Sequence, residues 1–111
     1  MAFSTVASAV LHGVQAEIIQ VETDVSNGLP VFHMVGYLSS EVKEAAERVR
    51  TAIQNCGMQL PPKKIVVNLA PATMRKRGAS YDLPIALSVL AAMGVFSTES
   101  LRGVVVAGEL G

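Results

Sequence analysis

The segment NLAPATMRKRGASYDLPIAL, residues 68–87, brings several side chains that could do chemistry close together in one expected loop. Its reactive members are three consecutive cations, a glycine and a serine: Arg75, Lys76, Arg77, Gly78 and Ser80. These residue types fit three kinds of site. The segment could form a phosphate-binding loop, seat a serine nucleophile, or present a basic surface to nucleic acid.

A phosphate-binding loop has the least support. A P-loop needs G-x-x-x-x-G-K-[ST], so that backbone amides approach the phosphate and the lysine faces it. Gly78 has no partner glycine in that frame, and Lys76 precedes it. The dinucleotide pattern G-x-G-x-x-G is also absent, and Asp82 would repel an anion at a helix start. We therefore expect no nucleotide at this loop.

Metal chemistry has no support either, because the two histidines and the cysteine lack zinc-type spacing. We expect His12 to be a turn residue and His33 to be a packed or rim residue of a strand. Cys56 is the only cysteine, which excludes an intrachain disulfide and points to a reducing compartment. The expected location is therefore the cytoplasm, with no metal or cofactor bound by this chain.

A serine nucleophile needs a base within hydrogen-bond reach, either a histidine or a lysine of lowered pKa. The nearest base to Ser80 in sequence is Lys76, which we expect to be solvated between its two arginine neighbours. Their charge would lower the pKa of Lys76 only modestly. We therefore favour a structural role for Ser80 at the start of a helix, and the nucleophile stays an alternative.

The net charge of zero conceals a strong segregation of charge. Residues 1–47 carry a charge of −5, from six acids and one base, whereas residues 48–81 carry +7 with no acid. The seven bases are Arg48, Arg50, Lys63, Lys64, Arg75, Lys76 and Arg77. Phosphate contacts need only positive charge and reach, but no aromatic residue interleaves with these bases to stack on nucleobases. We therefore favour the interpretation that these bases are solvated surface residues. Contact of residues 63–64 and 75–77 with nucleic acid or a partner stays an open alternative.

The elements that must position these residues follow the order β-β-β-α-β-α-β. Strands are predicted over residues 3–11, 14–25, 31–35, 65–70 and 103–109. His12-Gly13 and Asn27-Gly28 are typical of hairpin turns and predict an early antiparallel meander. A shift in the apolar alternation at Ile18–Ile19 predicts a bulge or a strong twist. The apolar run of residues 65–70 predicts a strand buried on both faces or nearly so.

Two helices complete the prediction. The first begins at a Ser39 or Ser40 cap and ends at Gly57. Its apolar stripe is Val42, Ala46, Val49, Ile53 and Cys56, and Glu44–Arg48 supports its outer face. The second is capped by Asp82, with Pro84 tolerated in the first turn. It is apolar all round to Phe96, which predicts a helix covered on nearly every side.

The length and the composition of the chain limit its structural class. At 111 residues, 50% apolar and 16% charged, the chain predicts one core-rich α+β domain. No apolar run reaches the roughly 20 residues of a membrane span, and the first residues lack the basic start of a signal peptide. An expected strand runs into the last residues, GELG, so we expect the domain to be incomplete and to continue beyond Gly111.

Four blocks together resemble one family: GLPVFHMVG, EVKEAAERVRTAIQNCG, PPKKIVVNLAPATMRKRGASYDLPIALSVLAAMG, and the closing VAGELG. Within the third block, NLAPA and YDLPIA are the most specific pieces. The four blocks are similar to the amino-terminal domain of the magnesium-chelatase-like AAA+ ATPases of the ComM (YifB-type) competence family. The resemblance spans nearly all of residues 1–111. The family pattern VGLPD reads VGYLS here, at residues 35–39.

The resemblance implies a fold like the second domain of ribosomal protein S5 and the proteolytic domain of Lon. It also implies a longer parent protein, a hexameric ATP-driven motor acting in DNA recombination, whose ATPase domain would bind ATP and Mg²⁺. By similarity to Lon, Ser80 falls on the nucleophile position, whereas the partner lysine would lie beyond Gly111. Family members are not known as proteases.

The expectation is therefore a non-catalytic accessory domain, residues 1–111, that contacts the parent ATPase domain and neighbouring subunits. Arg75, Lys76 and Arg77, with Lys63 and Lys64, are the expected contact residues for DNA or a partner. Two alternatives stay open. One is a Lon-like Ser/Lys peptidase half-site at Ser80, and the other is a standalone nucleic-acid-binding module of the S5 type.

Overall fold

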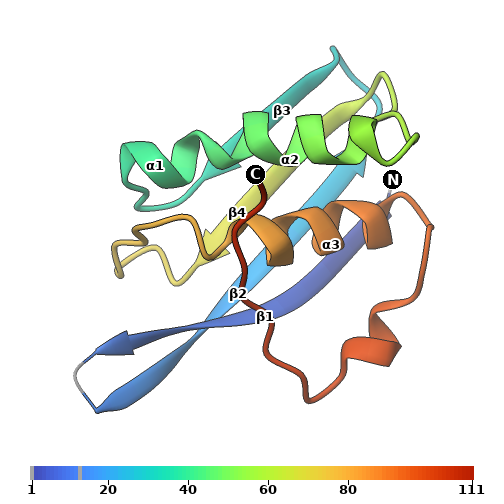
Figure 1. Cartoon of the computed structure of the whole chain (residues 1–111). Coiled ribbons are helices and arrows are strands. Elements are labelled where there is room, and N and C mark those ends of the chain that lie inside the picture. Colours follow the sequence, from blue (N-terminus) through green and yellow to red (C-terminus); the bar gives the residue numbers. More distant parts are fainter. Residues whose placement is uncertain (1, 13) are drawn as a thin grey trace.

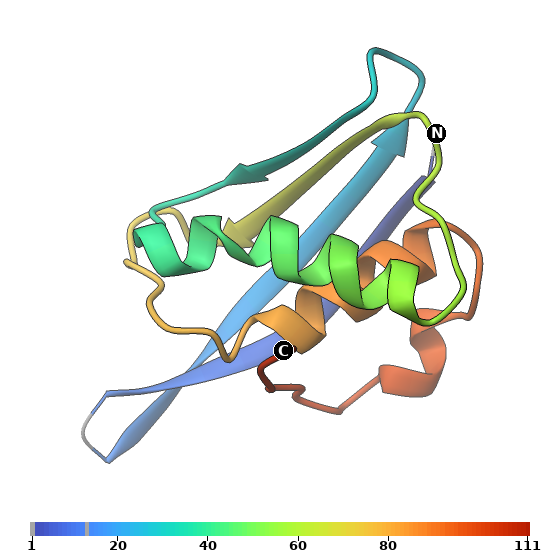
Figure 2. The ribbon, with the colours of Figure 1, turned by 45° about the horizontal axis from the view of Figure 1, so that its top comes forward.

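A sheet of four strands, in the order β1-β2-β4-β3, carries the helices on one of its faces (Figures 1 and 2). The computed structural model describes residues 2–12 and 14–111. The elements are β1 (Ala2–His12), β2 (Gln15–Ser26), β3 (Val31–Val35), α1 (Ser40–Lys43), α2 (Ala45–Asn55), β4 (Lys64–Ala70), α3 (Asp82–Ala92) and the 3₁₀ helix η1 (Thr98–Leu101). The core lies between the sheet and the helices α2 and α3.

The β1–β2 hairpin confirms the first predicted turn, although Gly13 itself lies outside the described residues. Its antiparallel register runs without interruption from Ala2↔Val25 to His12↔Gln15. The predicted bulge is therefore wrong, and the alternative of a strong twist stays a prediction. The alternation of apolar residues along β2 changes at Ile19 for another reason. Residues 15–18 are exposed on both faces, because the hairpin extends past the helices (Figure 1), and alternating burial begins only at Ile19.

The second predicted hairpin is wrong. β3 does not pair with β2 but runs parallel to β4, which lies between them and pairs antiparallel with β2. A parallel pair needs a crossover, and α1 and α2 supply it. β4 takes the central position because Ile65, Val67 and Leu69 pack against the helices. Its opposite face is half-buried except at Lys64, so burial of that face is partial, in the direction of the prediction.

The first helix is divided at Glu44 into α1 and α2. Ser39 is its cap, since its Oγ accepts a hydrogen bond from Val42 N at 3.3 Å, and Gly57 follows the helix with a φ of +82°. The predicted stripe is buried except for Cys56, which is exposed. The predicted Glu44–Arg48 pair is wrong, because Arg48 bonds Asp82 instead.

Helix α3 is covered as predicted: no residue from Asp82 to Ala92 is exposed. It packs on β1 and β2 and beside α2. Its one polar residue in mid-helix, Ser88, lies in a buried hydroxyl cluster. The Ser88 Oγ is 2.7 Å from Thr23 Oγ1 and 2.9 Å from Ser4 Oγ. These contacts satisfy the polar group that would otherwise oppose burial of the helix.

The predicted strand over residues 103–109 is wrong. It makes one parallel bridge, Ala7↔Val105, with Val106 N donating to Ala7 O at 2.9 Å. The chain then turns away to the start of α3, where Gly108 N donates to Ser80 O and Gly108 O accepts from Leu83 N. The backbone groups that a strand would offer to β1 are used at this helix instead.

The fold is therefore α+β with a mixed four-stranded sheet and two main helices. The likeness to the second domain of ribosomal protein S5 stays a prediction. Within residues 2–12 and 14–111, no helix has the length and apolar character to cross a membrane.

Gly36 should be the glycine least tolerant of a side chain. Its φ is +134°, and an added Cβ would lie 2.9 Å from the Leu69 carbonyl oxygen. We expect Gly36→Ala to lower the free energy of unfolding by about 2–3 kcal/mol, measured by urea titration. Gly78→Ala is the control, because it has a φ of +81° and open space, and should cost about 1 kcal/mol. Equal losses would contradict a steric role for Leu69.

Candidate functional site

The loop of residues 71–81, between β4 and α3, is held against the segment that precedes α1. Lys76 N donates to Tyr37 O, and Ser39 N donates to Lys76 O, both at 2.9 Å. These bonds form an isolated parallel bridge between Leu38 and Lys76. Extended backbone alternates its side chains between two sides. The bridge therefore fixes which side chains of the loop point inward and which point outward.

Lys76 points inward, so the prediction of a solvated lysine is wrong. Its side chain is fully buried, and its Nζ donates to the Pro71 carbonyl oxygen. Burial lowers the pKa of Lys76 from its ordinary value, because a low-dielectric interior disfavours the ammonium form. Lys76 therefore closes the loop from within and presents no charge to a partner.

Arg75 and Arg77 point the other way and are exposed. Among the described residues, neither forms an ion pair with an acid. Two unpaired guanidinium groups on one side of a held backbone make a natural contact for anionic groups. Of the three consecutive cations, Arg75 and Arg77 are therefore the two that the structure leaves available.

Tyr37 is the member of this surface that sequence reasoning missed. The parallel bridge sets Leu38 against Lys76, both inward, so the preceding residues, Tyr37 and Arg75, are both directed outward. The Tyr37 side chain is 54% exposed. An aromatic ring therefore does accompany the cations. No local pattern could reveal it, because the two segments meet only through tertiary structure.

Lys63 and Lys64 are exposed as well, but the structure does not bring them to this surface. They precede or begin β4, whereas Arg75 and Arg77 follow its other end. The seven residues of β4 separate the two groups by about 20 Å, at the usual rise of a strand. The predicted contact residues therefore form two separate cationic groups.

Asp82 anchors the end of the loop. Its carboxylate is fully buried and accepts two hydrogen bonds from Arg48, Nε to Oδ2 at 2.7 Å and Nη2 to Oδ1 at 3.0 Å. Oδ2 also accepts from Leu110 N at 3.2 Å. The hydrogen bond to Asp82 raises the pKa of Arg48. Asp82 makes no capping bond to its own helix, so its predicted role as a cap is wrong.

Ser80 is exposed, and its carbonyl oxygen accepts from Gly108 N at 2.8 Å. Among the described residues, no hydrogen bond joins its hydroxyl to a base. The Lys76 amine is occupied by the Pro71 carbonyl. The next residue, Tyr81, is buried, and burial raises the pKa of its phenol. A Ser80–Lys76 dyad is therefore not assembled in this conformation.

The described part of the chain holds no cluster of histidine, cysteine and acidic residues that could bind a metal ion. His33 is exposed on the sheet face away from the helices, in the edge strand β3, so of the two predicted alternatives it is a rim residue and not a packed one. Cys56 is exposed too.

Comparisons with known proteins agree on one family. Residues 21–111 match the family model described as subunit ChlI of Mg-chelatase. The chain is 46% identical over 110 residues to YifB of Salmonella typhimurium, covering 99% of this chain and 22% of YifB. It is 43% identical over 102 residues to the competence protein ComM of Haemophilus influenzae, covering 92% of this chain and 20% of ComM. The chain thus spans about a fifth of the length of these relatives.

The Arg48–Asp82 pair should be strongly coupled. Removing one partner leaves a buried or half-buried charge alone, so Asp82→Ala and Arg48→Ala should each cost about 3 kcal/mol of unfolding free energy. The double variant should cost little more than either single one, as urea titration of the full cycle will measure. The exposed Arg50–Glu47 pair, at 3.8 Å, is the control and should show a coupling below about 0.5 kcal/mol. Additive losses at Arg48 and Asp82 would contradict the pairing.

Lys76 should make stability rise with pH. Burial lowers its folded-state pKa below 10.5, so between the two pKa values the unfolded chain binds more protons than the folded protein. The free energy of unfolding should therefore increase as pH rises toward 10.5. Tyr81, whose raised pKa acts in the opposite direction, contributes only as pH passes about 10. Urea titrations between about pH 8 and pH 10 should show the rise in the wild type and its loss in Lys76→Met. The same slope in both proteins would contradict this assignment.

Proposed function

Because the chain belongs to the family of the ChlI subunit of Mg-chelatase, we propose that it is an accessory interaction domain of a longer AAA+ ATPase that processes DNA. In this proposal ATP and Mg²⁺ bind to another domain of that longer protein, and this domain contacts DNA beside a hexameric motor in the cytoplasm. The relatives support the proposal, since the match covers most of this chain but only about a fifth of YifB or ComM.

The observation that carries the DNA contact is the surface of Tyr37, Arg75 and Arg77. Arg75 and Arg77 are exposed and unpaired among the described residues, and the Leu38–Lys76 bridge holds the backbone beneath them. Guanidinium groups bind phosphate oxygens through paired N–H groups, and an exposed ring beside them offers a face for a base. This combination supports binding of single-stranded DNA, with little dependence on sequence.

The surface of Tyr37, Arg75 and Arg77 supports ligand binding rather than catalysis. A nucleophilic serine needs a base that is free to take its proton, whereas the Lys76 amine donates to Pro71 O. A Lon-like peptidase at Ser80 would need its base from residues outside this chain. A standalone nucleic-acid module would use the same arginines, so the DNA test below also applies to it.

A fluorescein-labelled single-stranded oligonucleotide tests the proposal by anisotropy at increasing salt. We expect affinity to fall with salt, and the double variant Arg75→Gln/Arg77→Gln to reduce the slope of log K against log salt by about 1.4. Ser80→Ala is the control and should change neither affinity nor slope. Absent binding, or binding that ignores salt, would overturn the DNA contact. Labelling of wild type, but not of Ser80→Ala, by a fluorophosphonate would instead favour the peptidase.

A further inference from the structure

The two outer edges of the sheet differ in whether other residues of the chain bond to them. The β1 edge is partly occupied, because Val106 N donates to Ala7 O. The β3 edge faces away from the rest of the molecule (Figures 1 and 2). Val31 N donates to Lys63 O on the β4 side at 3.4 Å. In a parallel ladder every second residue faces the partner strand, so the N–H and C=O groups of Phe32 and Met34 point outward.

This open edge lacks the usual protection against pairing. Natural edge strands are commonly blunted by charged residues, a proline or a bulge within the strand. β3 reads VFHMV, and its register with β4 is regular over all five residues. Val31 and Val35 are 43% and 38% exposed. An apolar, regular edge of this kind is a template for an added strand.

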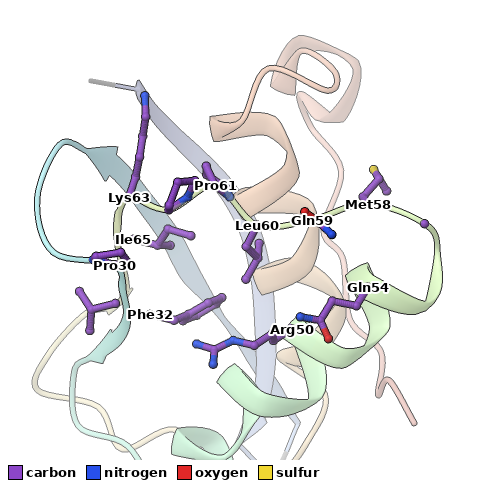
Figure 3. Close-up of a pocket in the computed structure, with 13 residues that line it drawn as sticks. Pro30, Phe32, Arg50, Gln54, Met58, Gln59, Leu60, Pro61, Lys63 and Ile65 are labelled. Atoms are coloured by element: carbon purple, nitrogen blue, oxygen red, sulfur yellow. The ribbon is translucent and has the colours of Figure 1, made fainter.

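A pocket of about 610 Å³ lies beside the same edge, between β3, α2 and residues 57–63 (Figure 3). Phe32, Leu60 and Ile65 supply its apolar part, and Arg50 and Lys63 supply positive charge. No aspartate or glutamate lines it. Arg50 reaches from α2 toward β3, with its guanidinium 5.9 Å from the centre of the Phe32 ring. The size is in the range of ligand pockets.

We propose that the β3 edge and this pocket form one site that binds an extended acidic peptide of a partner protein. The peptide adds to the sheet as a strand, through the outward backbone groups of Phe32 and Met34. Alternate side chains of an added strand face the helix side. There an apolar side chain packs against Phe32 and Leu60, and a carboxylate two residues away meets Arg50 or Lys63.

The charge of the pocket favours this occupant over a second copy of the chain. Pairing of two β3 edges would bring together two VFHMV strands, neither of which carries an acid. Arg50 and Lys63 would then gain no carboxylate. The nearest acid, Glu47, is exposed and lies 3.8 Å from Arg50, a pair of the kind that contributes little. An acidic peptide supplies the missing charge. This site is independent of the proposed DNA contact.

The probe is a short fluorescein-labelled peptide in which valine and glutamate occupy alternate positions with threonine between them, so that both face the same side. We expect saturable binding to the 111-residue chain by anisotropy, weakened about tenfold in the double variant Arg50→Gln/Lys63→Gln. Arg75→Gln/Arg77→Gln is the matched control, because it removes the same charge at the far end of β4, and should bind as wild type does. Circular dichroism verifies that both double variants are folded.

Two changes to the probe test the mode of binding. Methylation of alternate backbone nitrogens removes donors while keeping the side chains, and it should abolish binding. Replacement of glutamate by lysine should do the same. Absent binding to the wild type, equal weakening by both double variants, or full binding of the methylated peptide would each overturn the proposal. Sedimentation tests for a dimer of the chain. A dimer that the peptide disrupts, and that forms equally well in Arg50→Gln/Lys63→Gln, would assign the β3 edge to a second copy instead.

Discussion

The ion pair between Arg48 and Asp82 is the contact on which the arrangement of the helical layer depends. The Asp82 carboxylate is fully buried, so it must be compensated within the protein. Arg48 provides two hydrogen bonds from α2, and Leu110 N provides a third. The same guanidinium donates to the Glu41 carbonyl oxygen at 2.8 Å. One pair therefore joins both helical segments of the crossover, the start of α3 and the end of the described chain.

This junction also determines what the preceding loop can do. Residues 71–81 are fixed at the Leu38–Lys76 bridge and again at Asp82, so little freedom remains between the two points. Lys76 fills the space beneath the loop and bonds Pro71 within it. The adjacent arginines are directed to solvent, and the backbone that carries them is held in place before a partner binds. Such pre-organisation reduces the entropy that a partner must offset when it binds there.

The sequence was informative where the determining contacts are local. The Ser39 cap, the Gly57 stop and the uniformly apolar character of α3 depend on neighbours a few residues away, and each was confirmed. Strand pairing is different, because Asn27-Gly28 favours a hairpin that the central position of β4 overrides. Arg48 could bond Glu44 one turn away, but a buried carboxylate elsewhere in the fold is the stronger partner. The bridge between Leu38 and Lys76, which brings the segment of Tyr37 to the loop, is likewise non-local.

The run of seven bases over residues 48–81 illustrates why charge along a sequence differs from charge on a surface. Arg48 is neutralised in the helical layer, and Lys76 is buried. The others divide between the two ends of β4, with Arg50 and Lys63 at the pocket and Arg75 and Arg77 at the loop. A separation of about 20 Å exceeds the Debye length of about 8 Å in physiological salt. The two cationic groups therefore act on their ligands independently, and one small domain has room for an anionic polymer at one end and an acidic peptide at the other.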